Sequence, residues 1–163
     1  MSTFEDPRFR WRETYFVQFD TVHRPSIQKF KEAVAALGDR FTLENLAADD
    51  NGRFESCTLM APDDFAAIDV CYLEGEEVLE QGFELANELE DTVRSPDGFQ
   101  RVNHLRMFAG RFDVLHFEQV SDEDGENEPP EMLDPSSLFV ILDMLAELTQ
   151  GIAVDPQSGA FCE

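Results

Sequence analysis

Apolar and polar positions alternate with the period of a β-sheet through much of the first half of the chain. Residues 14–20 are rich in β-branched and aromatic side chains and too short for a globular helix, so they predict a first strand. Residues 41–46 and 53–60 flank an Asp-Asn-Gly turn, which is a strong hairpin signal. A further turn at 61–64 leads to alternating residues 65–73, and together these runs predict a three-stranded meander.

Four other segments show the three- and four-residue spacing of helices, namely residues 25–37, 76–91, 95–108 and 135–148. Gly38 and Gly151 are predicted to end the first and the last of them. The helix at 76–91 has an apolar stripe wide enough to lie on a sheet: Val78, Leu79, Phe83, Leu85, Ala86 and Leu89. The last helix is apolar around most of its circumference, so it must be covered on more than one side.

The remaining segments complete an α+β fold. Residues 112–120 predict a strand that is apolar on both faces and therefore interior to the sheet. Residues 152–162 predict a small terminal hairpin. Because strands and helices do not alternate strictly, the order favours a mainly antiparallel sheet with helices on one face. We expect a ferredoxin-like core over residues 13–120, extended by the C-terminal helix and hairpin.

The chain divides into three regions of different composition. Residues 1–120 form the predicted α+β core, and residues 135–163 carry the C-terminal helix and β-hairpin, which we expect to pack on that core as one domain. Residues 121–134 are predicted to be an acidic linker, because their first eleven positions contain acidic groups and prolines but no large hydrophobe. A chain of 163 residues is long enough for one hydrophobic core.

Charge is the outlying property of the composition. The chain has 35 acidic and 12 basic residues, a formal net charge of −23, and every Lys and Arg lies at or before Arg111. Such a surface argues against binding to nucleic acid or to an anionic membrane. The N-terminus lacks the pattern of a secretory signal, and no apolar run is long enough to span a bilayer, so the sequence indicates a cytoplasmic protein.

The acidic charge is most concentrated in the helix predicted at 76–91. Glu76, Glu80, Glu84 and Glu88 are four residues apart, so they form one column on the helix surface, which we call the glutamate ladder. Each adjacent pair of like charges costs roughly 0.2–0.5 kcal/mol at low salt. A basic protein surface would relieve this repulsion on binding, so the ladder is the predicted partner-binding site.

A different account of the acidity involves no partner. Proteins of organisms that live at high salt are acidic throughout, and there the short Debye length makes the repulsion small. Only Lys29 and Lys31 are lysines among the 12 basic residues, which is compatible with that account.

No local pattern indicates an enzyme, a cofactor or a metal. Acidic runs at 49–52 and 122–128 lack the glycine and glutamate spacing of a calcium-binding loop. His23, His104 and His116 have no nucleophile or metal-ligand context: His116 lies in an apolar strand and is predicted to be a hydrogen-bonded core residue, whereas His23 lies where ligand contacts are common. The three cysteines are widely spaced, which predicts free thiols.

These observations favour a non-enzymatic acidic protein–protein interaction module, for example an inhibitor or immunity-type protein that covers a basic partner. A homodimer through the C-terminal helix is also predicted. The alternative is a small-molecule-binding domain, or an enzyme with dispersed carboxylates that leave no local motif.

Overall fold

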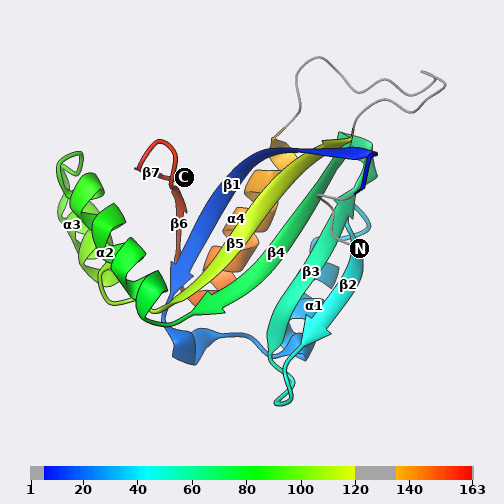
Figure 1. The fold of residues 1–163 in the computed structure, drawn as a ribbon, viewed down its shortest axis with the longest axis horizontal. Helices are drawn as coiled ribbons and strands as arrows, with labels where there is room; N and C mark the ends of the chain where they lie inside the picture. The colour runs from blue at the N-terminus through cyan, green and yellow to red at the C-terminus, as the bar shows by residue number, and fades with distance from the viewer. Residues whose placement is uncertain (1–5, 120–134, 163) are drawn as a thin grey trace.

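The computed structural model describes residues 6–119 and 135–162, and its strands form one antiparallel sheet (Figure 1). The strands lie in the order β2-β3-β4-β5-β1-β6-β7. Their bounds are β1 Phe9–Phe19, β2 Thr42–Ala48, β3 Phe54–Ala61, β4 Ala66–Glu74, β5 Gly110–Gln119, β6 Ile152–Asp155 and β7 Ala160–Phe161. The prediction of a mainly antiparallel α+β fold is confirmed.

The predicted meander and hairpins are present. β2, β3 and β4 pair in sequence order, and Gly52 has φ +75° in the turn between β2 and β3. Asp49 stabilises this turn, because its carboxylate accepts hydrogen bonds from the main-chain amides of Asn51 and Arg53, both at 2.9 Å. β6 and β7 form the terminal hairpin.

The four helices are α1 Ile27–Ala35, α2 Glu76–Glu90, α3 Pro96–Leu105 and α4 Ser136–Thr149, with short 3₁₀ turns at Thr21–His23 and Pro62–Asp64. The side chains of Ser26 and Ser95 cap the N-termini of α1 and α3 by accepting main-chain N–H groups. α1 and α4 cover the face of the sheet that points away from the viewer in Figure 1.

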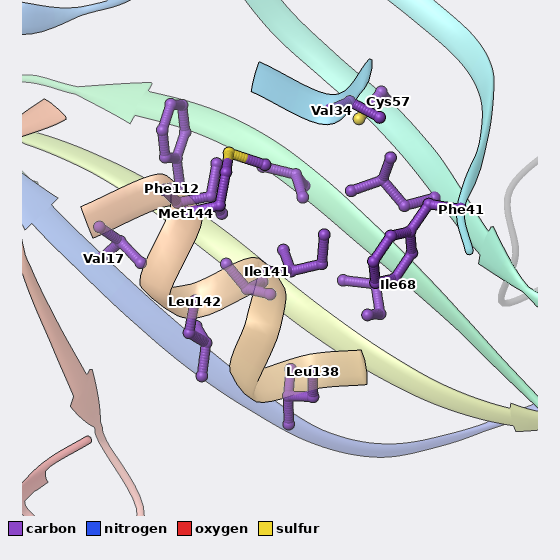
Figure 2. Packing of buried hydrophobic residues seen from close by; sticks show 14 of the residues in the cluster. Val17, Val34, Phe41, Cys57, Ile68, Phe112, Leu138, Ile141, Leu142 and Met144 are labelled. Carbon is purple, nitrogen blue, oxygen red and sulfur yellow. The ribbon is translucent and has the colours of Figure 1, made fainter. Parts of the chain in front are cut away.

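The main core lies between this face and α4. Val17 and Phe112 of the sheet pack in one cluster with Leu138, Ile141 and Leu142 of α4 (Figure 2). These side chains are at most 1% exposed. α4 is thus covered by the sheet and flanked by α1, as the nearly all-round apolar character of its sequence requires.

The ferredoxin-like core is not confirmed, and the sheet is larger than that fold. A ferredoxin-like core inserts a strand into its first β-α-β unit. Here β3, β4 and β5 all lie between β1 and β2. β5 is a central strand that pairs with β4 on one side and β1 on the other, as its apolar faces predict. It is the third of the strands that separate β1 from β2.

The helices do not all lie on one face, which corrects the sequence prediction. Phe16 and Gln18 alternate with Val17 along β1, so they point to the opposite face. On that face, Phe16 packs in a second cluster with apolar residues of α2, α3 and β6: Leu85, Ala86, Leu89, Val93, Val102, Leu105, Ile152 and Val154. An amphipathic pattern shows that a helix has a buried face, but it carries no information on which side of a sheet receives it.

The C-terminal region packs on the rest of the chain through both of its elements. α4 contributes to the main core, and β6 pairs with β1 through Val17 and Ala153. The acidic linker predicted at 121–134 lies outside the described residues. Among the described helices, none combines the length and the apolar composition needed to cross a bilayer.

Candidate interaction surface

The glutamate ladder lies on the surface of α2. Glu76, Glu80, Glu84 and Glu88 are all exposed, and none of the four forms an ion pair with any residue that the structure describes. No basic residue lies in the last turn of α2 to offset the helix dipole. The repulsion predicted along this column is therefore not relieved within the described part of the chain.

An apolar column runs beside the ladder. Leu79 and Phe83 are four residues apart on α2, and their side chains are 37% and 49% exposed. The sequence placed both in the buried stripe, and this placement is wrong. Only the part of the stripe centred on Val78, Leu85 and Leu89 is covered. Leu79 and Phe83 lie on the edge of the stripe next to the ladder, which a finer helical projection would have shown.

The α2–α3 hairpin carries an unusual share of exposed apolar surface. Of the eight large hydrophobic side chains that remain exposed among the described residues, four belong to residues 79–107: Leu79, Phe83, Phe99 and Met107. In Figure 1 the hairpin stands at one end of the sheet. Aromatic and methionine side chains that flank charge in this way are typical of protein-binding surfaces.

The close packing of α2 on α3 depends on Gly82. A Cβ atom at this position would lie 3.1 Å from the carbonyl oxygen of Leu105 and 3.5 Å from the Gln18 side chain. The contact holds the buried side of α2 against α3 and the sheet, so the ladder and the apolar column face outward.

Arg111 of β5 contacts α2 but does not compensate the ladder, because its side chain is buried. Arg111 is 7% exposed, stacks on the ring of Phe16 at 4.0 Å and lies 2.7 Å from Asp113. It also donates a hydrogen bond to Gln81 of α2. Burial raises the pKa of Asp113, although Arg111 opposes this shift. The positive charge is thus used within the fold.

Arg106, the C-terminal cap of α3, brings a positive charge to the side of α2. It pairs with Glu90 at 2.8 Å and lies over the ring of Phe83 at 5.7 Å. Glu90 is outside the ladder, so this pair leaves the four ladder carboxylates free for other contacts.

Metal-ligating side chains do not gather in the described residues: no group of three or more His, Cys, Asp or Glu is placed to hold an ion. Cys57, Cys71 and Cys162 are free thiols, and burial raises the pKa of Cys162 to about 11.

No protein-family model, curated protein or solved structure matches this chain.

The three histidines have separate surroundings. His116 is 1% exposed in β5 and its Nδ1 atom lies 3.2 Å from Glu13, which confirms the prediction of a hydrogen-bonded core histidine. His104 is exposed on α3 and stacks on Phe108. His23 is exposed in the 3₁₀ turn before α1, where it lines a pocket.

His116 gives the stability a pH dependence that can be tested. Burial lowers its pKa below the ordinary 6.5, although Glu13 opposes this shift. Below pH 6.5 the unfolded chain therefore takes up a proton that the folded chain resists, and stability falls as the pH is lowered, by at most about 1.4 kcal/mol per pH unit. Urea unfolding of the wild type and His116→Gln from pH 7.5 to 5 measures this.

The variant isolates the histidine, because the relief of the net charge of −23 on acidification acts equally on both proteins. The free energy of unfolding of the wild type should fall relative to His116→Gln as the pH is lowered. Parallel curves for the two proteins would show that the burial of His116 does not control its protonation.

A groove between α1 and α4 is the other apolar feature. It has a volume of about 500 Å³ and is lined by Ala33, Ala36, Leu37, Val140, Asp143, Met144, Glu147 and Leu148. Phe139, the residue before Val140 on α4, is 39% exposed. The homodimer through the C-terminal helix stays a prediction.

Proposed function

We propose that this protein is a non-enzymatic interaction module that binds a basic protein surface through α2, as an inhibitor or immunity-type protein would. The observation that carries the proposal is the pairing of two exposed columns on one helix: the glutamate ladder, and Leu79 with Phe83 beside it. Charged groups steer and orient association, and desolvated aromatic side chains supply most of the binding energy.

The apolar column favours this proposal over general adaptation to high salt. Adaptation to salt accounts for acidic residues spread over the surface, but it gives no reason to expose Phe83 at 49% on the most acidic helix. A partner that offers lysines or arginines around an apolar pocket accounts for both features, because it relieves the repulsion and removes the phenylalanine from water.

A labelled, lysine-rich amphipathic helical peptide tests the proposal, with a scrambled peptide of the same composition as its control. The wild type should bind the amphipathic peptide more tightly at low salt than at high salt. Phe83→Ala and the double reversal Glu80→Lys with Glu84→Lys should each weaken binding by roughly tenfold. Fluorescence anisotropy measures these affinities.

A matched double reversal on exposed positions of the meander, Glu44→Lys with Glu55→Lys, makes the same change in net charge. It should leave the affinity within about twofold of the wild type. Equal losses in the two double variants, or equal binding of the scrambled peptide, would reduce the effect to net charge and overturn the assignment to α2. The α2 reversal should also raise the free energy of unfolding by about 1 kcal/mol at low salt, because it turns the like-charge pairs 76/80 and 84/88 into opposite-charge pairs.

A further inference from the structure

A pocket at the start of α1 has the opposite charge to the rest of the molecule. Its volume is about 440 Å³, and its walls come from the β1–α1 connection, the turn between β2 and β3, and the end of α4. Arg24, Lys29 and Arg53 line it together with His23. None of the ten lining residues carries a carboxylate, in a chain with 35 acidic and 12 basic residues.

Two of these cations are available for a ligand. Lys29 and Arg53 are exposed, and neither side chain forms an ion pair or hydrogen bond with the residues that the structure describes. Asp49, which accepts the main-chain amide of Arg53, is close enough to interact with its charge but does not ion-pair with it. In so acidic a protein, two cations that line one pocket without an ion-paired carboxylate are unusual. Nearby, Lys31 on the same helix is also exposed but does not line the pocket, so it serves as an internal comparison.

Arg24 is fixed and builds the wall. Its side chain is 9% exposed, its Nε and Nη2 atoms donate to the carbonyl oxygen of Phe54 at 3.0 and 2.8 Å, and it lies over the ring of Tyr72 at 4.1 Å. Its Nη1 atom is 3.2 Å from Asp49. Arg24 therefore joins the connection before α1 to the hairpin, and Asp49 offsets its charge, so Lys29 and Arg53 are the cations left for a ligand.

Main-chain bonds keep the two walls in register. The amide of Ile27 donates to the carbonyl of Gly52 at 2.8 Å, and the amide of Phe54 donates to that of Pro25 at 3.0 Å. Figure 1 shows the connection from β1 to α1 passing across the ends of the central strands, at the end of the sheet that carries the β2–β3 turn. Lys29 and Arg53 are thus presented by two backbone segments that are hydrogen-bonded to each other, and Ser26 and Arg53 form an antiparallel bridge.

We propose that this pocket binds a small organic phosphate ester. A phosphate monoester has a charge between −1.5 and −2 at neutral pH and three acceptor oxygens, which suit two free cations and the neutral donors of Ser26, Asn51 and Gln150. The volume lies in the range of small-molecule sites and exceeds the needs of a bare phosphate ion. Apolar wall residues Val22 and Leu148 suit the organic part of the ester.

The side chains that line the pocket, and not the N-terminus of α1, supply the attraction for the phosphate group. Ser26 already caps α1, because its hydroxyl oxygen accepts the amide of Lys29 at 3.1 Å. The pocket shares no residue with the α2 surface and has the opposite charge. A phosphate ester bound here would make the protein a small-molecule-binding domain, which is the alternative function inferred from the sequence.

Titration calorimetry of the full chain with ribose 5-phosphate tests the site. At about 0.15 M salt the Debye length is about 8 Å, so the distant carboxylates are largely screened. Ribose 5-phosphate should bind with a saturable heat, and ribose should not. Lys29→Gln and Arg53→Gln should each weaken binding by roughly tenfold, because each removes one charged hydrogen bond. Lys31→Gln should change it by less than about twofold.

Three results would overturn the proposal. The first is the absence of saturable binding of ribose 5-phosphate up to about 10 mM. The second is an equal loss in Lys31→Gln and Lys29→Gln, which would show a general charge effect. The third is tighter binding of succinate or inorganic phosphate than of ribose 5-phosphate, which would exclude the ester. Because Lys29 and Arg53 are exposed, circular dichroism should show that the variants remain folded.

Discussion

Phe112→Ala is expected to lower the free energy of unfolding by about 3–5 kcal/mol. Phe112 is fully buried near the start of β5. Its ring centroid lies 4.8 Å from that of Phe19 and 5.5 Å from that of Phe54, which it meets edge to face. Truncation therefore loses apolar burial, leaves a cavity and removes the favourable ring contacts.

Chemical denaturation of Phe112→Ala measures this loss. Since domains of this kind are stable by only about 5–15 kcal/mol, the variant should be close to unfolding at moderate temperature. Phe139→Ala is the matched control, because Phe139 is 39% exposed on α4 and should cost less than about 1 kcal/mol. Similar losses in the two variants would contradict the placement of Phe112 at the centre of the core.

Gly151→Ala should lower the free energy of unfolding by about 2–3 kcal/mol, a cost typical of overpacking. A Cβ atom on Gly151 would lie 2.5 Å from the carbonyl oxygen of Gln18 and 2.8 Å from Oγ1 of Thr149. The first contact is with the main chain of β1, which is paired on both sides and has no room to retreat. Thr149 is held by its own hydrogen bond to the carbonyl of Leu145.

Gly38→Ala is the control for Gly151→Ala, because it measures the cost of backbone strain without a steric contact. Gly38 has φ +86°, and a methyl group on its Cα would meet no atom within 4 Å, so alanine there should cost about 1 kcal/mol through conformation alone. Thermal and urea unfolding of both variants give the comparison. A loss in Gly151→Ala no larger than in Gly38→Ala would mean that β6 moves away from β1 at little cost.

Gly151 also shows how a correct boundary can have an unexpected cause. The sequence predicts that this glycine ends α4. In the structure Gln150 takes the left-handed conformation, with φ 53°, and the bare Cα of Gly151 permits the close approach of β6 to β1. The position of the helix end follows from the sequence, but the reason for the glycine is a tertiary contact.

The two proposed sites differ in how far the sequence predicts them. The glutamate ladder is a local pattern, because residues four apart on one helix form a column whatever the rest of the chain does. Its exposure and the exposed Phe83 beside it depend on which side of α2 meets the sheet. The basic pocket has no local signature, because Arg24 and Lys29 are separated in sequence from Arg53 by the whole of β2.

The sequence by itself determined the elements of this protein: the meander, the four helices, the interior strand β5 and the terminal hairpin. Each follows from hydrophobic periods and turn residues that act over a few positions. Only the tertiary structure decided that three strands separate β1 from β2, that α2 packs on the opposite face from α4, and that Arg53 joins Arg24 and Lys29 in one pocket. These features depend on pairings between segments far apart in the chain, for which local periodicity has no preference.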